Sequence, residues 1–353
     1  MIMPETMRAV LLRGHGGPEM LEYRDDIPVP LPATGDALVE VGACGVNNTD
    51  IWVREGAYGA KDDPDAVSSF GDEPLKFPRI QGADIAGRII AVGAGVDQAR
   101  IGARVMIDFG IYDDADENSA SVDYIGHARD GGFAEYAAVP AENARSVDTD
   151  LSDAELATFC CAYVTGERML NRARVTSGET ILITGASGGV GSGVVQLCRA
   201  RGAVPVAVVG PGKEAALREI GAAAVITRGV GDFKTEVMKA LSGPIDVVVD
   251  TVAGPLFSDL LALLRRRGRY VSCGAIGGPV VEFDVRTMYL NHLDLIGSSQ
   301  GSRREFNAVV DYALSGRIRP LLARAYSLAD IARAQADFKK KDFVGKLVII
   351  IRS

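Results

Sequence analysis

Two stretches of the sequence combine residue types and spacing that could do chemistry. Residues 42–50 read GACGVNNTD, in which Cys44 and Asp50 are donors that zinc could use and the asparagines could hydrogen-bond to a substrate. Residues 181–191 read ILITGASGGVG, with glycines between an apolar run and a run of helical spacing. Such a turn exposes backbone N–H groups that bind phosphate. Together the two stretches raise the question of whether a metal or only hydrogen bonds assist the chemistry.

The glycine-rich turn predicts a dinucleotide site. One of its glycines makes the tight turn, one lets the backbone approach a pyrophosphate, and one lets the helix pack on the strand. Glycine in a tight turn can have a purely steric role, but this turn lies within a complete strand-helix-strand unit, which favours phosphate binding. The turn residues expected to contact the cofactor are Ala186, Ser187, Gly188, Gly189, Val190 and Gly191, following Gly185.

The end of the next strand indicates which dinucleotide fits. Residues 208–217 read VVGPGKEAAL, and Gly210 stands where an NAD site usually places Asp or Glu for the ribose 2′-hydroxyl. Without that carboxylate there is no repulsion of a 2′-phosphate, and Lys213 supplies a cation close by. These features favour NADPH. The alternative is that Lys213 is an ordinary surface residue in a first helical turn.

The elements that must position these residues follow two different sequence patterns, one in each half of the chain. From about residue 151 apolar strands alternate with amphipathic helices, which predicts an α/β doubly wound parallel sheet. Strands are expected at 179–187, 204–210, 223–227, 245–251, 268–275 and 293–298, and helices at 189–202, 213–220, 232–241, 255–264 and 303–315. The first 150 residues have short strand-like runs between Gly and Pro turns, typical of a β-rich, barrel-like domain, to which the run 344–352 returns.

Two long segments, 57–79 and 110–132, interrupt the series of short strand-like runs in the first domain. Loops of this length in a compact domain are usually functional or disordered. A lid or an interface is one interpretation, and an acidic solvated loop is the other.

Composition excludes several classes of protein. The chain has 353 residues, 47% hydrophobic and 24% charged, as in a soluble globular protein of two domains. A net charge of -8 argues against a nucleic-acid partner. No signal-peptide pattern and no apolar run of membrane-spanning length is found, so a cytoplasmic protein without a membrane partner is expected. The five cysteines are widely spread, which predicts reduced and mostly buried thiols.

Several stretches resemble the medium-chain dehydrogenase/reductase superfamily over nearly the whole chain. They are MRAVLL with GHGGPEMLEYRD, GVNNTD, FPRIQGADIAGRIIAVGAGV, DGGFAEYAAVPAEN, GETILITGASGGVGSGVVQLCRARGA and VGKLVII. Within the superfamily the chain most resembles the zinc-free, quinone-oxidoreductase-like branch. The resemblance implies a GroES-like substrate domain at 1–150, completed by 300–353, a Rossmann domain at 151–299, and hydride transfer from NADPH in the cleft between them.

The resemblance also allows the zinc ligands to be compared position by position. Zinc-dependent members carry a ligand Cys where this chain has Asn47, and a ligand His in G-H-E where it has Ala83 followed by Asp84. Only Cys161, in CCAYVTG, matches the third ligand, and Cys44 stands three residues before the first ligand position. Three protein ligands are needed for catalytic zinc, so no metal is expected. The region 110–132 also lacks the four cysteines of the family's structural zinc.

Without a Lewis acid, reduction of a quinone or an activated alkene is the expected chemistry, because hydrogen bonds can stabilise the delocalised charge. The resemblance places Asn47 and Tyr58 beside the small-molecule hydride acceptor as hydrogen-bond or proton donors, with Thr49 as a further donor and Trp52 as a wall of the cleft. The alternatives are that Asn47 caps a turn, that Tyr58 belongs to a mobile loop, and that Trp52 is a core residue.

Further residues are expected at the cofactor by the same resemblance. They are Thr165 against the nicotinamide, the strand ends Thr251, Val252, Gly274 and Ala275, and Lys346. A helix N-cap is an alternative for Thr165, and a solvated side chain is an alternative for Lys346. His127, in the second long loop, could approach the cleft, but a lone histidine in a loop is more often solvated, which is the expectation here.

Three other functions stay open: a 2-enoyl thioester or enone reductase, a zinc-type alcohol dehydrogenase, and a protein that binds NADPH without significant catalysis. A homodimer is expected from the resemblance, with the apolar, strand-like segment 274–285 at the sheet edge as a suitable contact.

Overall fold

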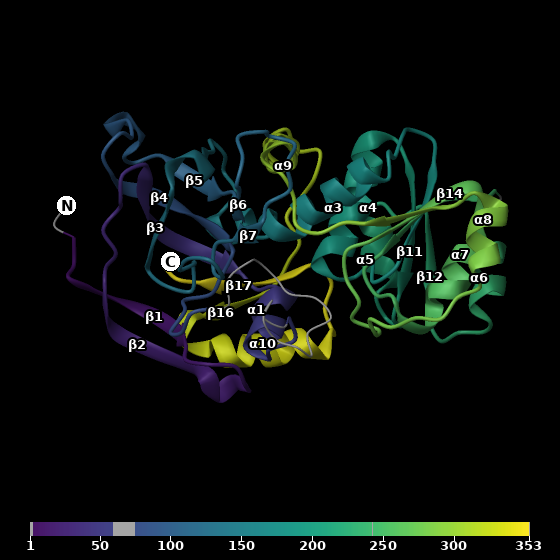
Figure 1. The fold of residues 1–353 in the computed structure, drawn as a ribbon, viewed down its shortest axis with the longest axis horizontal. Helices are drawn as coiled ribbons and strands as arrows, with labels where there is room; N and C mark the ends of the chain where they lie inside the picture. Colours follow the sequence, from purple (N-terminus) through teal and green to yellow (C-terminus); the bar gives the residue numbers. More distant parts are fainter. Residues whose placement is uncertain (1–2, 59–74, 242, 353) are drawn as a thin grey trace.

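Two sheets divide the chain into two lobes that lie side by side in the computed structural model (Figure 1). The structure describes residues 3–58, 75–241 and 243–352. One lobe is built on a six-stranded parallel sheet and the other on a seven-stranded, mostly antiparallel sheet. The predicted fold class, a GroES-like β-rich domain plus a Rossmann domain, is confirmed.

The parallel sheet has the strand order β12-β11-β10-β13-β14-β15. Its strands are β10 (Thr180–Ile183), β11 (Val204–Val209), β12 (Ala224–Thr227), β13 (Ile245–Asp250), β14 (Leu264–Ser272) and β15 (Asp294–Gly297). Its helices are α4 (Gly189–Arg201), α5 (Glu214–Glu219), α6 (Phe233–Ala240), α7 (Phe257–Leu263) and α8 (Val285–Asn291). The order reverses between β10 and β13, so the carboxyl ends of these two strands form the switch point where a dinucleotide binds in such folds.

The second sheet joins the two ends of the chain. Its order is β16-β17-β3-β4-β5-β9, with β8 also paired to β3. The strands are β3 (Asp36–Gly45), β4 (Asp84–Val92), β5 (Arg104–Ile107), β8 (Tyr136–Pro140), β9 (Ala144–Ser146), β16 (Leu322–Ser327) and β17 (Lys346–Ile350). Strand β17 pairs antiparallel with β3, with Ile349 opposite Cys44, so the C-terminal run returns to the first domain as expected.

Short hairpins and single helices complete this lobe. Strands β1 (Thr6–Leu12) and β2 (Leu21–Pro28) pair with each other, as do β6 (Gly110–Ile111) and β7 (Asp123–Tyr124). Helix α1 (Asn48–Arg54) follows β3, and α10 (Ile331–Lys340) precedes β17. The short helix α2 (Asp153–Leu156) leads to α3 (Cys160–Arg172), which packs on α4 and on α9 (Arg303–Leu314) between the lobes (Figure 1).

One sequence-based prediction about elements is wrong, and one alternative is excluded. The segment 274–285 is not a strand, because its glycines and Pro279 form turns, and β15 is the edge of the parallel sheet. Thr165 is not an N-cap, because α3 begins five residues earlier at Cys160. Among the described residues, no helix combines the length and hydrophobicity that crossing a bilayer requires.

Candidate functional site

The turn between β10 and α4 has the shape of a phosphate cradle. Gly185 has a φ of +57°, and a Cβ placed on it would lie 2.4 Å from Thr251 Oγ1. A Cβ on Gly191 would lie 2.4 Å from the Gly185 carbonyl oxygen. The N-cap of α4 is Gly188, which has no side chain to occupy the first N–H groups of the helix. Only glycine fits these close approaches, and the open helix end suits the pyrophosphate of a dinucleotide.

A buried carboxylate organises the neighbouring strand end. Asp250, the last residue of β13, accepts hydrogen bonds from the Tyr270 hydroxyl at 2.5 Å, from Val252 N at 2.8 Å and from the Thr184 hydroxyl. Ala253 N also donates to it at 3.1 Å. These bonds fix the turn 251–253 beside the glycine-rich loop, which brings Thr251 and Val252 to the predicted cofactor position.

Two lysines, Lys213 and Lys341, lie near Ser187 of the same loop. Lys213 Nζ lies 3.2 Å from Ser187 Oγ and also donates to the Lys341 carbonyl oxygen. Burial, together with the ammonium groups of Lys213 and Lys346, lowers the pKa of Lys341 to about 8. Burial likewise lowers the pKa of Lys213, and Arg228 adds to that effect. No atom lies within 4 Å of a Cβ placed on Gly210, so the space beside these cations is open.

The Asn47 region contains a buried cluster built around an ammonium group. Lys346 is 2% exposed, and its Nζ donates to Asp84 Oδ2 at 2.7 Å and to Asn47 Oδ1 at 2.6 Å. The other carboxylate oxygen of Asp84 accepts from Cys161 N at 2.8 Å. The positions compared with zinc ligands therefore converge, but they converge on a lysine from the far end of the chain.

The charges of this cluster oppose a metal. Burial disfavours the ammonium of Lys346, but the Asp84 carboxylate outweighs it and the pKa is raised above the usual lysine value. Burial raises the pKa of the Cys161 thiol to about 12, so this sulfur is a neutral thiol beside the ammonium, and it is the one cysteine at the compared positions. No group of three or more His, Cys, Asp or Glu able to hold a metal ion exists among the described residues. The residues at this position do not fit catalytic zinc.

Asp50 joins the cluster from the first turn of α1. Its Oδ2 accepts from Asn47 N at 2.7 Å, and burial raises its pKa to about 7. Asn47 is itself the N-cap residue of this helix. Thr49, in the same turn, is half-buried.

Two aromatic side chains of the Asn47 region lie close to each other. The rings of Trp52 and Tyr58 lie 5.5 Å apart, and Trp52 is half-buried, so it is not a core residue. Burial raises the pKa of Tyr58 to about 12, with contributions from Cys161 and Cys273. Cys161 belongs to α3 and Cys273 follows β14, so Tyr58 lies between the two lobes. Its hydroxyl is protonated at neutral pH and can donate a hydrogen bond.

Most of the remaining predicted residues lie near this cluster or near the glycine-rich turn. Thr165 is buried in α3, four residues after Cys161, and its side chain partly offsets the rise in the pKa of that thiol. A Cβ on Gly274 would lie 3.2 Å from the Thr251 carbonyl oxygen, so the strand ends approach closely, and Ala275 follows. Lys346 is not solvated, and its stem lies against the cradle, since a Cβ on Gly189 would lie 2.7 Å from Lys346 Cδ. Part of the first long loop, 59–74, lies outside the described residues.

The second long loop corrects one expectation and adds a residue. His127 is buried rather than solvated, because its Nδ1 lies 2.8 Å from Asp123 Oδ1 and its ring stacks on Tyr124. Asp50 and Tyr58 are both close enough to raise the pKa of the buried Tyr124, although burial is the main cause. Tyr124 therefore lies close to the candidate site. Its sequence context, an acidic loop, gave no sign of this position.

Two other residues were missed for different reasons. The sequence indicated Asp84 only as a residue at a metal-ligand position. Its negative charge also predicts a cationic partner, because a buried carboxylate is costly when it is unpaired. Lys341 occurs in a run of lysines, a pattern that is typical of a solvated helix end. Its position beside Lys213 follows from the tertiary fold.

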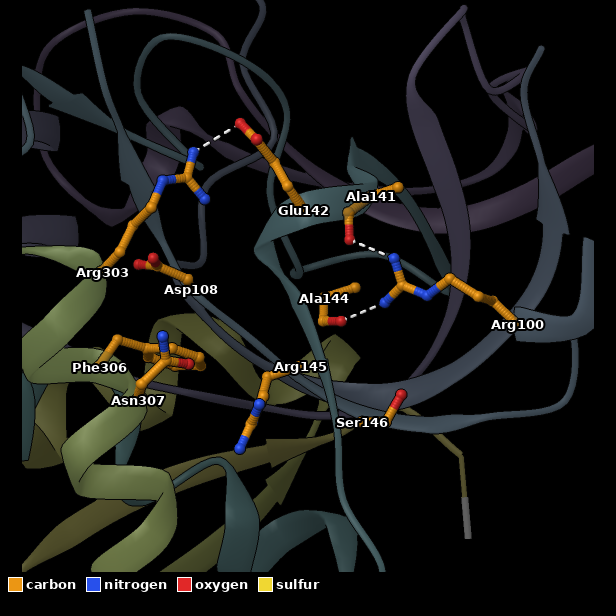
Figure 2. Close-up of a pocket in the computed structure, with 10 residues that line it drawn as sticks. All are labelled: Arg100, Asp108, Ala141, Glu142, Ala144, Arg145, Ser146, Arg303, Phe306 and Asn307. Atoms are coloured by element: carbon orange, nitrogen blue, oxygen red, sulfur yellow. Dashed lines mark hydrogen bonds and ion pairs between the residues drawn. The ribbon is translucent and has the colours of Figure 1, made fainter. Parts of the chain in front are cut away.

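Two hollows on the surface lie away from these residues. One, of about 380 Å³, lies between the segment 141–146 and α9, and Figure 2 shows Arg303 directed to Glu142 and Arg100 directed to backbone carbonyls. The other, of about 620 Å³, is lined by Arg174, Thr176, Glu179, Arg265, Arg267, Arg269, His292 and Asp294. Their arginines are mostly paired with carboxylates or carbonyl oxygens, and neither hollow contains a predicted site residue.

Comparisons with known families match both lobes. Residues 33–149 match the family described as alcohol dehydrogenase GroES-like domain, and residues 189–315 match the family described as zinc-binding dehydrogenase. The acryloyl-coenzyme A reductase of Metallosphaera sedula is 30% identical over 354 residues, which cover 97% of this chain and 99% of that protein. The quinone oxidoreductase of Homo sapiens is 28% identical, with 98% of each chain covered.

Solved structures give the same picture. A Sinorhizobium meliloti 1021 protein solved as a candidate alcohol dehydrogenase is 62% identical, with a TM-score of 0.94 over 99% of this chain and 97% of that one. A cobalt- and zinc-bound alcohol dehydrogenase from Pyrobaculum aerophilum is 32% identical, with a TM-score of 0.83 over 98% and 100%. A 2-octenoyl-CoA carboxylase reductase in complex with NADP and 2-octenoyl-CoA is 25% identical, with a TM-score of 0.86 over 99% and 88%.

Proposed function

The chain belongs to the medium-chain dehydrogenase/reductase superfamily of oxidoreductases, and from that premise we propose that it transfers hydride from NADPH to a quinone or an activated alkene without zinc. The observation that carries this proposal is the buried ammonium of Lys346 between Asp84 and Asn47, where zinc-dependent relatives have their ligands. The buried ammonium repels a metal cation and pairs with the Asp84 carboxylate, and Cys161 alone is fewer than the three protein ligands that catalytic zinc needs. Hydrogen-bond donors then have to stabilise the reacting oxygen.

The cradle at Gly185, Gly188 and Gly191 would hold the pyrophosphate, and Lys213 with Lys341 would hold the 2′-phosphate. The NADP named in the 2-octenoyl-CoA carboxylase reductase complex supports this choice of cofactor. Bound NADPH would supply the hydride. Lys213→Glu is expected to weaken NADPH binding about 30-fold and NADH binding only slightly, because only NADPH carries the phosphate that the glutamate repels. Similar losses for both cofactors in fluorescence titrations would contradict the assignment.

Asn47 and Tyr58 would act on the acceptor. Asn47 Nδ2 is a buried donor with no acceptor among the described residues, so it can bind an acceptor oxygen. Tyr58, whose pKa is about 12, is a neutral hydroxyl at physiological pH and can donate a second hydrogen bond or a proton. Both donate to charge that develops on oxygen as hydride is added to a conjugated system.

The test is NADPH oxidation with quinones, enones and 2-enoyl thioesters as acceptors. Saturable NADPH binding without turnover of any acceptor would instead indicate a binding protein. A 2-enoyl thioester reductase is the second candidate, supported by similarity to an acryloyl-coenzyme A reductase and to a structure containing 2-octenoyl-CoA. The ratio of kcat/KM for crotonyl-CoA to that for naphthoquinone distinguishes the two.

Zinc independence needs its own measurement, because the Pyrobaculum aerophilum relative is described with bound cobalt and zinc. Elemental analysis of the purified chain is expected to find much less than one zinc per chain, and activity is expected to survive chelation. One tightly bound zinc, with activity lost on its removal, would favour an alcohol dehydrogenase.

We also propose a homodimer through the edge of the parallel sheet. Strand β15 is an edge, and exposed apolar side chains lie on it and on the preceding segment: Val280, Tyr289, Leu290 and Leu295. Figure 1 shows α8, which carries two of these residues, at the outer end of its lobe. Light scattering is expected to give twice the 37.2 kDa chain mass, and Leu290→Glu is expected to shift the mass towards one chain.

A further inference from the structure

The orientation of the Asn47 carboxamide is determined by a neighbouring charge. Its Oδ1 accepts from Lys346 Nζ at 2.6 Å, and its Nδ2 is buried without an acceptor among the described residues. Exchange of the two atoms would direct the amide N–H groups at an ammonium, which also only donates. The lysine therefore excludes the flipped amide and leaves Nδ2 as the available donor.

Lys346 is held in place by contacts on three sides. Its Nζ pairs with Asp84 Oδ2 at 2.7 Å, and Asp84 is in turn bound by Cys161 N at 2.8 Å. Its stem lies against the phosphate cradle, where a Cβ on Gly189 would be 2.7 Å from Lys346 Cδ. The ammonium cannot leave Asn47 without unpairing a fully buried carboxylate.

We propose that Lys346 is a positioning residue that orients the Asn47 amide so that Nδ2 donates to the oxygen of the acceptor. This inference rests on the proposed function and gives that site a specificity: the acceptor must present a carbonyl or quinone oxygen. In this arrangement Lys346 and Asp84 stay paired throughout, and the lysine touches neither the acceptor nor the hydride. Its effect on acceptor binding passes entirely through Asn47.

A double-mutant cycle tests this dependence. Lys346→Met combined with Asp84→Asn removes both charges while keeping the stem on Gly189, so no buried charge is left unpaired. This pair of substitutions is made in the wild-type chain and in the Asn47→Ala chain. Naphthoquinone and cyclohexenone are titrated into each protein saturated with NADP⁺, where no hydride is available, so that affinity is measured without turnover.

In the chain with Asn47, loss of the ion pair is expected to weaken binding of the probe about tenfold, the value of one hydrogen bond in a buried site. In the Asn47→Ala chain the same substitutions are expected to change binding less than about twofold, because no amide remains to be oriented. Affinity for NADP⁺ and the circular dichroism spectrum are measured for every variant to verify the fold. Lys340→Met, at an exposed lysine of α10 paired with Asp337, is the matched control and should behave as the wild type.

Equal losses in the two backgrounds would overturn the inference, because Lys346 would then act independently of Asn47. Binding of either probe without NADPH oxidation would contradict the proposed function alone, since the cycle would still report the orientation of the amide. Failure of the wild-type protein to bind both probes would overturn the inference and the proposed function together.

Discussion

Two buried carboxylates, one in each lobe, lie near the candidate site and are stabilised in different ways. Asp250, in the parallel sheet, is surrounded by neutral donors: two hydroxyls and the N–H groups of Val252 and Ala253. Asp84, in the other lobe, pairs with the ammonium of Lys346, which also binds Asn47. The Asp250 network leaves no polar side-chain atom unpaired among the described residues, whereas the Lys346 network leaves Asn47 Nδ2 without an acceptor.

The difference between the two networks indicates a structural role for Asp250 and a functional role for Asn47. A buried donor without an acceptor costs free energy, so it persists where a ligand supplies the missing partner. A complete network has no free group to offer and instead fixes the backbone, here the turn that follows β13 and lies beside the glycine-rich loop. We therefore expect damage to Asp250 to act on stability and damage to Asn47 to act on turnover.

Asp250→Ala is expected to have the largest effect on stability. It leaves four donors without this acceptor, three of them on buried residues, which should lower the free energy of unfolding by about 3 kcal/mol. Urea denaturation followed by circular dichroism measures the change. Asp259→Ala, at a partly exposed carboxylate paired with Lys234, is the matched control and should change the free energy by less than about 0.5 kcal/mol. A loss as small as the control would mean that the Asp250 network is not structural.

Asn47→Ala is expected to lower kcat/KM for the acceptor about 100-fold, the usual effect of removing one donor from a developing oxyanion. The NADPH dissociation constant should stay near its wild-type value, and the free energy of unfolding should fall less than in Asp250→Ala, because Lys346 keeps its pair with Asp84. Asn118→Ala, in the exposed part of the second long loop, serves as the control. A fall in stability with unchanged kcat/KM would reverse the comparison between the two networks.

The same contrast explains how much could be predicted from the sequence. The fold class and the phosphate cradle follow from local patterns, since apolar runs, helical spacing and glycines act on their immediate neighbours. Asn47 was identified through resemblance, as a position where a ligand is replaced. The ion pair that surrounds it was not predicted, because Asp84 and Lys346 are 262 residues apart and only the pairing of β17 with β3 brings them together.

Errors of prediction have similar physical causes. The segment 274–285 is apolar like a strand, but glycine and proline turns within it prevent pairing, and the shorter β15 takes the edge. His127 lies in an acidic loop that reads as solvated, yet a contact with Asp123 four residues earlier and stacking on Tyr124 bury it. In each case the composition of the segment predicted one environment, and specific turns or contacts of the folded chain produced another.

Gly189→Ala tests whether the two networks communicate through Lys346. The added Cβ would lie 2.7 Å from Lys346 Cδ and 3.2 Å from Ala162 Cβ, so the lysine stem has to shift, and with it the ammonium that binds Asp84 and Asn47. Displacement of the lysine should disturb Asn47 and lower kcat/KM for the acceptor about tenfold. Gly297→Ala, where no atom lies within 4 Å of the added Cβ, is the control. Unchanged kcat/KM would show that the cradle and the acceptor site are independent.

The smallest predicted effect concerns pH and the cations beside the cradle. Burial first, and then the charges of Lys213 and Lys346, lower the pKa of Lys341 to about 8. The ammonium is charged below that pH and attracts the phosphates of NADPH, and it becomes neutral as the pH rises through about 8. The NADPH dissociation constant should therefore increase about threefold between pH 7 and pH 9, in proportion to one partly exposed charge.

Lys341→Met should remove this increase, leaving an affinity that is weak and nearly independent of pH over the same range, as measured by fluorescence titration. Lys239→Met, at an exposed lysine of α6, should keep the wild-type dependence. An unchanged pH profile in Lys341→Met would assign the titration to another group, and Asp50, with a pKa of about 7 in the Lys346 network, is the group to examine next. In that outcome the pH dependence of the enzyme would arise in the acceptor site, because Asp50 binds the backbone of Asn47.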